Sequence, residues 1–198
     1  MSEAPLMMEL KLVLAGIGGQ GVIYATKVLS QAALARGERV MVSENHGMSQ
    51  RGGSVLAHVK IGGSESPLIR RATADALIAF DRTEALRTVT FARSGGSVFV
   101  NGQQPFEAVV LDCLNELNIG VHLIDADARA KELGTAAVTN LIVLGFAVAH
   151  AAWPLTLDDL ENSVRTLGPA RAVDINLRAL AIGHAARRAS GVIVHETV

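Results

Sequence analysis

The chain has 198 residues, of which 49% are hydrophobic and 19% are charged, and its formal net charge is −1 at pH 7. A chain of this length can bury the core of one domain, and we expect a single domain over residues 1–198. Acidic and basic residues are mixed along the sequence, so the chain lacks the basic patch that neutralises nucleic-acid phosphates. Nucleic acid is therefore not an expected partner.

The sequence contains one cysteine, Cys113. An iron–sulfur cluster needs four ligands and a disulfide needs two, so this chain can hold neither. Cys113 lies in an apolar helical pattern, where we expect its thiol to pack as a small hydrophobe. The N-terminal residues do not resemble a secretory signal, and the most apolar stretch, 136–153, is short for a membrane span. We therefore expect a cytoplasmic protein with no membrane segment.

The predicted elements alternate between strands, marked by short apolar runs, and helices, marked by apolar positions three or four residues apart. The expected strands are 10–15, 39–43, 54–61 (of undetermined direction), 76–80, 97–100 and 121–124. The expected helices are 20–36, 83–93, 126–133, 137–151, 157–167 and 173–188. The first strand, helix and second strand would form a βαβ unit, and Gly95-Gly96 would turn the chain into 97–100. This order predicts an α/β fold: a Rossmann-like, doubly wound, mostly parallel sheet with a helical C-terminal part.

A first glycine-rich segment, Gly16-Ile17-Gly18-Gly19-Gln20-Gly21, stands between a predicted strand and a predicted helix. Glycines allow a tight turn and a close approach of the backbone, and the helix N-terminus offers unpaired N–H groups to an anion. The natural ligand is a phosphate, a pyrophosphate or a carboxylate. The candidate contacts are Gly16, Gly18, Gly19, Gln20 and Gly21. The alternative is that the glycines only allow close packing of the helix on the strand.

A second segment places an imidazole, a guanidinium and several amide or hydroxyl groups among three glycines, over Glu44 to Ser54. It has almost no apolar side chains that could bury it, so it is built to approach a ligand or to be a flexible loop. His46 is a candidate proton carrier near neutral pH, although it could instead bond a neighbouring backbone group. Glu44 could equally orient its own loop. The candidate ligand contacts are Glu44, Gly47, Ser49, Gln50, Arg51 and Gly52.

The two segments together resemble the signature of the gamma domain of pyruvate and 2-oxoacid:ferredoxin oxidoreductases. The likeness covers almost the whole chain, because 66–69, 74–77, the strand that ends at Asn101 and 173–180 also resemble that family. Two long motifs in the same order and spacing are far more specific than one glycine pattern. Among family members, a free-standing chain with this second segment is most similar to the beta subunit of indolepyruvate ferredoxin oxidoreductases.

The resemblance implies an enzyme assembly in which thiamine diphosphate adds to a 2-oxoacid and carbon dioxide leaves. Electrons then pass singly through iron–sulfur clusters to ferredoxin, and coenzyme A takes the acyl group. Thiamine diphosphate and the clusters would be held by a large partner subunit and no cofactor by this chain, which alone would be inactive. This chain would complete the active-site assembly. Its substrate would be indolepyruvate or another aryl pyruvate.

In doubly wound sheets, ligands bind beyond the carboxyl ends of the strands. We therefore expect four segments to line one surface there: 16–21, 44–53, Asp81 and Asn101. Asn101 is a further candidate ligand contact, and Arg51 would be the charged contact to coenzyme A phosphates or to the substrate carboxylate.

Two other functions fit the same residues. An independent NAD(P)- or flavin-binding enzyme would use 16–21 for pyrophosphate and Glu44 for ribose. A non-catalytic dimerising scaffold would use the Ala-rich helices near 137–151 and 173–186, which suit close packing within the fold or across a homodimer. The remaining histidines are scattered without metal-ligand spacing, so no metal site is predicted.

Overall fold

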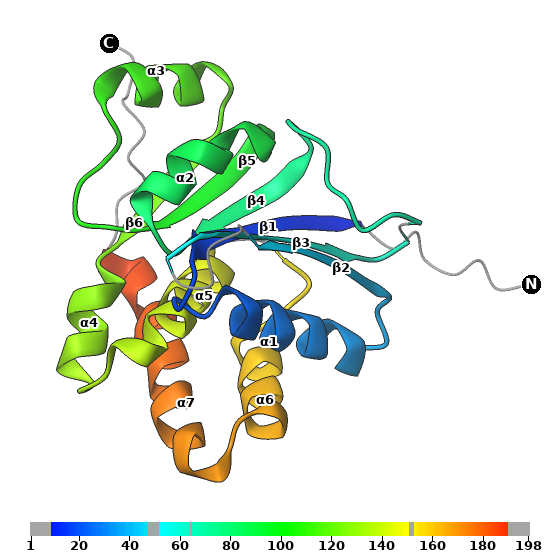
Figure 1. The fold of residues 1–198 in the computed structure, drawn as a ribbon, viewed down its shortest axis with the longest axis vertical. Coiled ribbons are helices and arrows are strands. Elements are labelled where there is room, and N and C mark those ends of the chain that lie inside the picture. Colours follow the sequence, from blue (N-terminus) through cyan, green and yellow to red (C-terminus); the bar gives the residue numbers. More distant parts are fainter. Residues whose placement is uncertain (1–8, 47–51, 64, 151–152, 190–198) are drawn as a thin grey trace, which may run out of the picture.

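The computed structural model describes residues 9–46, 52–63, 65–150 and 153–189, and its strands form one mixed sheet between two layers of helices (Figure 1). In the described part of the chain, the sheet has six strands in the order β2-β3-β1-β4-β5-β6. The strands are β1 (Leu10–Ile17), β2 (Val40–His46), β3 (Ser54–Ile61), β4 (Ala74–Ala79), β5 (Ala92–Asn101) and β6 (Gly120–Ile124).

Helices cover both faces of the sheet (Figure 1). They are α1 (Val22–Ala35), α2 (Arg82–Thr88), α3 (Ala108–Glu116), α4 (Ala126–Glu132), α5 (Thr139–His150), α6 (Leu157–Leu167) and α7 (Ala170–Ala185), with 3-10 turns η1 (Val89–Phe91), η2 (Ala136–Val138) and η3 (Ala186–Ala189). Helices α2 and α3 lie on one face, and α1, α4, α5, α6 and α7 lie on the other. The predicted α/β, doubly wound, mostly parallel architecture with a helical C-terminal part is confirmed.

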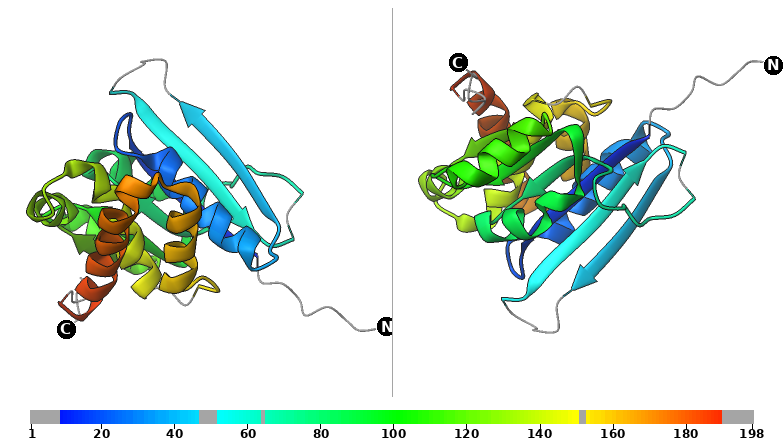
Figure 2. Two further views of the ribbon diagram at one scale, coloured as in Figure 1. Left: turned by 90° about the horizontal axis from the view of Figure 1, so that it is seen from below. Right: turned by 90° about the horizontal axis from the view of Figure 1, so that it is seen from above.

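Strand β3 is the antiparallel member of the sheet. It pairs antiparallel with β1 and with β2, whereas β1, β4, β5 and β6 pair in parallel. Figure 2 shows β2 and β3 side by side at one margin of the sheet. Strands β1 and β2 therefore run in the same direction, as expected for a βαβ unit, but β3 lies between them.

The sheet separates two hydrophobic cores because successive side chains of a strand point to opposite faces. Along β1, Leu12 and Leu14 pack in the core with α1 and α5, and Val13 and Ala15 pack in the core with α2 and α3. Helix α5 is buried at every position of 139–149, which agrees with the buried helix expected from its apolar sequence. Among the described residues, no helix has the length and apolar character needed to cross a membrane.

Helices α5 and α7 approach each other through glycine. A Cβ atom on Gly145 would lie 2.2 Å from the carbonyl oxygen of Leu180, and one on Gly183 would lie 1.9 Å from that of Ile142. Real Cβ contacts do not reach such distances, so only glycine fits at these two positions. The close helix packing expected from the small residues therefore occurs within the fold.

The prediction for 83–100 was wrong in detail. Helix α2 ends at Thr88, and β5 begins at Ala92 and runs through Gly95 and Gly96 instead of starting after them. A Cβ atom on Gly96 would lie 3.1 Å from the carbonyl oxygen of Asp75, and the β4–β5 register shifts nearby. The glycines thus mark a bulge with close backbone approach, which sequence alone does not separate from a turn.

The expectation that Cys113 packs as a small hydrophobe was also wrong, because its side chain is exposed. Helix α3 covers the sheet with one narrow stripe, formed by Leu111 and Leu114. Cys113 stands between these two residues in the sequence but faces away from the stripe that they form. Its apolar neighbours in the sequence therefore did not predict its exposure.

Candidate functional site

The carboxyl ends of the five strands other than β3 lie at the same end of the described sheet. Strands β1, β2, β4 and β5 run in the same direction, so Ile17, His46, Ala79 and Asn101 all lie at that end. The segments expected to line one surface therefore start from the same side of the sheet.

The first glycine segment forms a tight turn between β1 and α1. The backbone N–H of Ile17 donates to Oε1 of Gln20 at 2.7 Å, and the N–H of Gln20 donates to the carbonyl of Ile17 at 3.0 Å. Gly19 and Gly21 have φ values of +104° and +77°, which favour glycine. A Cβ atom on Gly16 would lie 2.9 Å from Gln20 Oε1. Gln20, a predicted ligand contact, thus uses its side-chain oxygen to close the turn.

Among the described residues, no side chain caps the N-terminus of α1. Its N-cap residue is Gly21, and its first turn contains no acidic residue, so this helix start can offer its first N–H groups to a bound anion. A groove of about 140 Å³ lies here, lined by Ile17, Gly18, Gly19, Gly21, Val22, Ile23 and Val55. Glycine backbone and helix N–H groups on one wall suit a phosphate or a carboxylate.

The second segment reaches the first at its C-terminal end. The N–H of Gly18 donates to the carbonyl of Gly53 at 2.8 Å, and Gly52 is exposed with a φ of +78°. His46 ends β2, where its register partner on β3 is Val55. The predicted contacts Gly47, Ser49, Gln50 and Arg51 lie outside the described residues.

The predicted contact Glu44 lies farther from the first segment. It is exposed on β2 and pairs in register with Ala57, so β3 separates it from β1. In a dinucleotide-binding fold the ribose-binding acid follows a strand adjacent to the first one. The insertion of β3 removes that relationship.

The side chains of Asp81 and Asn101 make hydrogen bonds to other protein groups at this end of the sheet. Oδ1 of Asp81 accepts from the N–H groups of Thr83 and Glu84 at 2.8 and 3.0 Å and thus caps α2. Asn101 is buried; its Nδ2 donates to the carbonyl of Phe80 and to Asp127, and its Oδ1 accepts from the N–H of Ala126. Both side chains therefore contact protein groups at the places where ligand contact was considered.

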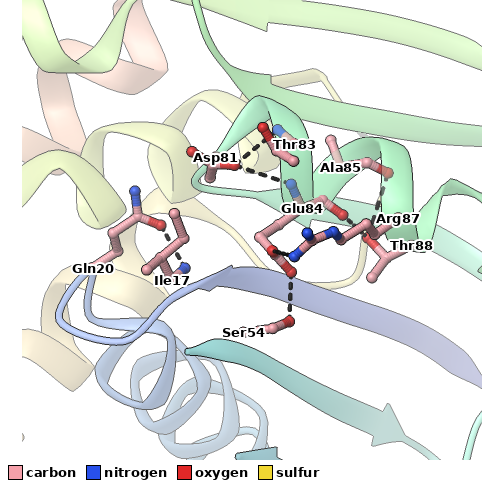
Figure 3. Close-up of polar contacts among 9 residues, drawn as sticks. All are labelled: Ile17, Gln20, Ser54, Asp81, Thr83, Glu84, Ala85, Arg87 and Thr88. Atoms are coloured by element: carbon pink, nitrogen blue, oxygen red, sulfur yellow. Dashed lines mark hydrogen bonds and ion pairs between the residues drawn. The ribbon is translucent and has the colours of Figure 1, made fainter. Parts of the chain in front are cut away.

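Sequence reasoning missed Glu84 of α2, whose side chain points toward Ser54 at the start of β3 (Figure 3). Its carboxylate is buried; Oε2 accepts from the hydroxyl of Ser54 at 2.5 Å, and Oε1 lies 2.7 Å from Nη1 of Arg87. A helical acid three residues after the Asp81 cap is a local signal for a helix start. No local signal connects it with Ser54, thirty residues earlier.

Sequence reasoning also missed Asn140, a buried residue at the start of α5. Its Nδ2 donates to the carbonyl of Gly21 at 2.9 Å, and its Oδ1 accepts from the N–H of Leu141. Asn140 thereby holds the end of the first glycine segment against a helix from the C-terminal half of the chain.

The histidines outside the second segment take other roles. Nδ1 of the buried His58 accepts from the N–H of Ile69 at 2.9 Å, and burial, with the nearby charge of Lys60, lowers the pKa of His58. His122 stacks on Phe99, with ring centroids 4.9 Å apart, and contacts His150. Burial lowers the pKa of His122 to about 4. In the described part of the chain, no three His, Cys, Asp or Glu residues gather as metal ligands would.

Residues 11–186 match the family model described as pyruvate ferredoxin/flavodoxin oxidoreductase. The chain belongs to this family. The match covers most of the chain, and it confirms the resemblance seen in the two glycine segments. The chain is accordingly a subunit of the 2-oxoacid:ferredoxin oxidoreductase class.

Relatives of similar length support the same assignment. The chain is 32% identical over 190 residues to the indolepyruvate oxidoreductase subunit IorB of Archaeoglobus fulgidus, covering 89% of this chain and 94% of that protein. It is also 32% identical over 192 residues to IorB of Pyrococcus horikoshii, covering 89% and 95%.

Solved structures of family members share the fold. The gamma subunit of a keto/oxoacid ferredoxin oxidoreductase from Geobacter sulfurreducens matches with a TM-score of 0.72 at 22% identity, covering 91% of this chain and 99% of that one. The 2-oxoglutarate:ferredoxin oxidoreductase from Magnetococcus marinus matches with a TM-score of 0.74 at 18% identity, covering 91% of this chain and 31% of that longer one. These likenesses concern the fold alone.

Proposed function

We propose that this chain is the small subunit of a thiamine-diphosphate-dependent 2-oxoacid:ferredoxin oxidoreductase and completes its active-site assembly. The observation that carries the proposal is the direct contact between the two glycine segments, Gly18 N–H to Gly53 C=O, beside the uncapped N-terminus of α1. This contact joins both family motifs into one surface at the sheet edge where α/β proteins bind ligands.

A large partner subunit would hold thiamine diphosphate and the iron–sulfur clusters. There, thiamine diphosphate would supply the carbanion chemistry of oxidative decarboxylation, in which a 2-oxoacid and coenzyme A give acyl-coenzyme A and carbon dioxide. The clusters would carry the two electrons released to ferredoxin. The single cysteine of this chain supports that division, because a cluster needs four ligands.

This chain would contribute contacts to an anionic group of coenzyme A or of the 2-oxoacid. The first N–H groups of α1 and the backbone of Gly18 and Gly19 line the groove that would receive it. Arg51 would supply the charged contact, with Gly47, Ser49, Gln50 and Gly52 beside it and with His46 as a proton carrier. Glu44 would orient this segment from β2. Asn101, whose amide is engaged by Phe80, Asp127 and Ala126, would hold the end of β5 in place at the site instead of contacting the ligand.

The proposed substrate is indolepyruvate or another aryl pyruvate. Relatives named for indolepyruvate are 31–32% identical over about nine-tenths of this chain. A relative named for ketoisovalerate is 30% identical over 91% of this chain, and one named for 2-oxoglutarate is 28% identical. The proposed setting is the cytoplasm, in a complex with the large subunit and, through it, with ferredoxin.

The test is reconstitution of this chain with its large partner. The assembled enzyme is expected to reduce ferredoxin in the presence of coenzyme A and indolepyruvate, and the partner alone is expected to be much less active. Arg51→Ala should raise the Michaelis constant for coenzyme A or for the 2-oxoacid about tenfold, as loss of one charge-assisted hydrogen bond implies. Unchanged constants for both would refute the role of Arg51.

A second measurement separates the proposal from an independent dehydrogenase. The insertion of β3 between β1 and β2 argues against a dinucleotide site, because Glu44 is not on a strand adjacent to β1. Titration of the purified chain with NADH is therefore expected to show no saturable binding. Tight binding with hydride transfer would favour the dehydrogenase.

A further inference from the structure

We propose that Glu84 is a positioning residue that fixes Ser54 and thereby sets the shape of the groove at the start of α1. This inference rests on the proposed function, in which the groove receives a phosphate or carboxylate group. Glu84 itself is not among the residues that line the groove. It belongs to α2 and acts through the hydroxyl of Ser54, toward which its side chain points in Figure 3.

The carboxylate of Glu84 is an unusual group to bury. Its side chain is 3% exposed, and both oxygens are engaged, one by Ser54 and one by Arg87, whose own side chain is 65% exposed. Burying an ion pair rarely improves stability over an apolar side chain of similar size. What the carboxylate does provide, and an apolar group would not, is a fixed position for the Ser54 hydroxyl.

Helix α2 gives Glu84 a rigid base. Asp81 accepts from the N–H of Glu84, and the hydroxyl of Thr88 donates to the carbonyl of Glu84 at 2.6 Å. The backbone of Glu84 is thus tied to the end of β4 and to the next helical turn. Because its backbone is fixed in this way, the Glu84 side chain can hold a residue of a neighbouring strand in one position.

Ser54 transmits that position to both walls of the groove. It is the first residue of β3 and pairs in register with Ile17. On one side of it, Gly53 accepts the hydrogen bond from Gly18; on the other side, Val55 lines the groove. A shift of Ser54 therefore moves Gly53 and Val55 together, in a groove of only about 140 Å³.

The test uses serine variants of the reconstituted enzyme. Ser54→Ala removes the hydrogen bond to Glu84, so Gly53 and Val55 are no longer held in place. The Michaelis constant for the ligand that enters the groove should therefore rise about five- to tenfold, with little change in kcat. A rise for coenzyme A alone identifies a coenzyme A phosphate, and a rise for the 2-oxoacid alone identifies its carboxylate. Ser54→Thr keeps the hydroxyl and should restore the wild-type constant.

Ser94→Ala is the matched control. The Ser94 hydroxyl also makes one hydrogen bond, 2.7 Å to the carbonyl of Leu117, but on β5 and outside the groove lining. Its Michaelis constants should equal those of the wild type. If losing a serine hydrogen bond only lowered the stability of the protein, both alanine variants would be affected alike, and the Michaelis constants for coenzyme A and for the 2-oxoacid would change together.

Glu84→Gln completes the cycle. Glutamine has nearly the same shape and keeps one acceptor for Ser54, so the rise should be smaller than in Ser54→Ala, and the double variant should be no worse than Ser54→Ala. Unchanged constants in Ser54→Ala, or additive effects in the double variant, would overturn the role of Glu84. An inactive wild-type assembly would instead refute the proposed function, and this inference with it.

Discussion

Asn140 and Gly21 are 119 residues apart in the sequence and are joined by a 2.9 Å hydrogen bond at the N-terminus of α1. The amide of Asn140 lies so close that a Cβ atom on Gly21 would be 2.3 Å from its Nδ2. The left-handed Gly21 therefore leaves space for the amide that holds it. The position of the proposed anion site depends on this contact between the two halves of the chain.

Asn140→Asp should destabilise the protein by about 2 kcal/mol at neutral pH. The donor to the Gly21 carbonyl is replaced by a buried carboxylate oxygen that faces another oxygen. Chemical denaturation of the purified chain measures the loss. The same change at the exposed Asn115 is the control and should alter stability by less than about 0.5 kcal/mol. Equal effects at the two positions would contradict the role of the Asn140–Gly21 bond.

Gly183→Ala should cost about 3 kcal/mol or more, because its Cβ atom would overlap the carbonyl of Ile142 on α5. The sign is opposite to that expected from helix propensity, since alanine normally favours a helix over glycine by about 1 kcal/mol. The melting temperature of the variant reports the cost. Gly63→Ala, with open space around the new Cβ atom, should melt close to the wild type. A Gly183→Ala variant as stable as Gly63→Ala would show that the two helices can separate freely.

The stability of the fold should fall in acid because of His122. Burial, and the charges of His150 and Arg187 nearby, lower the pKa of His122 from 6.5 to about 4, so the folded state holds the imidazole neutral. Its contribution is complete above the unfolded pKa and is lost as the pH falls from 6.5 towards 4. Allowing for solvent screening, the loss is about 2 kcal/mol.

Denaturation at several pH values checks this expectation. His122→Phe keeps an aromatic ring against Phe99 and removes the titrating group, so its stability should fall less steeply over the same pH interval. Identical slopes in the wild type and in His122→Phe would assign the acid sensitivity to other groups.

The exposed Cys113 should react quickly with a thiol reagent in the folded, isolated chain. Cys113→Ser should change the free energy of unfolding by less than about 0.5 kcal/mol, as is usual for surface positions. Counting modified thiols with and without denaturant tests the exposure. Modification only after unfolding would support the buried position that the sequence pattern favoured.

Periodicity predicted the order of most strands and helices because each element has a buried face. The buried α5 and the amphipathic α6 follow from their apolar positions. The direction of the strand at 54–61 could not be predicted. Its sequence pattern indicates which side chains are buried, but whether β3 runs parallel or antiparallel depends on the strands with which it pairs. Gly95 and Gly96 were read as a turn because glycine marks both turns and bulges.

The site was predictable where its residues are local. The turn from Gly16 to Gly21 follows from glycine spacing between a strand and a helix. Contacts made by Glu84 with Ser54, and by Asn140 with Gly21, join segments 30 and 119 residues apart. Such pairs are formed only when the sheet and its helices assemble, so a single sequence carries no sign of them.

The antiparallel β3 connects the second motif to the sheet in a different way from the first. The connection between β2 and β3 starts and ends on one strand pair, with His46 and Val55 as partners in register, whereas the first glycine segment joins a strand to a helix. The two motifs are thus attached to the sheet in different ways, one through the order of strand and helix along the chain and the other through an antiparallel strand pair. The Gly18–Gly53 hydrogen bond is the point where they meet.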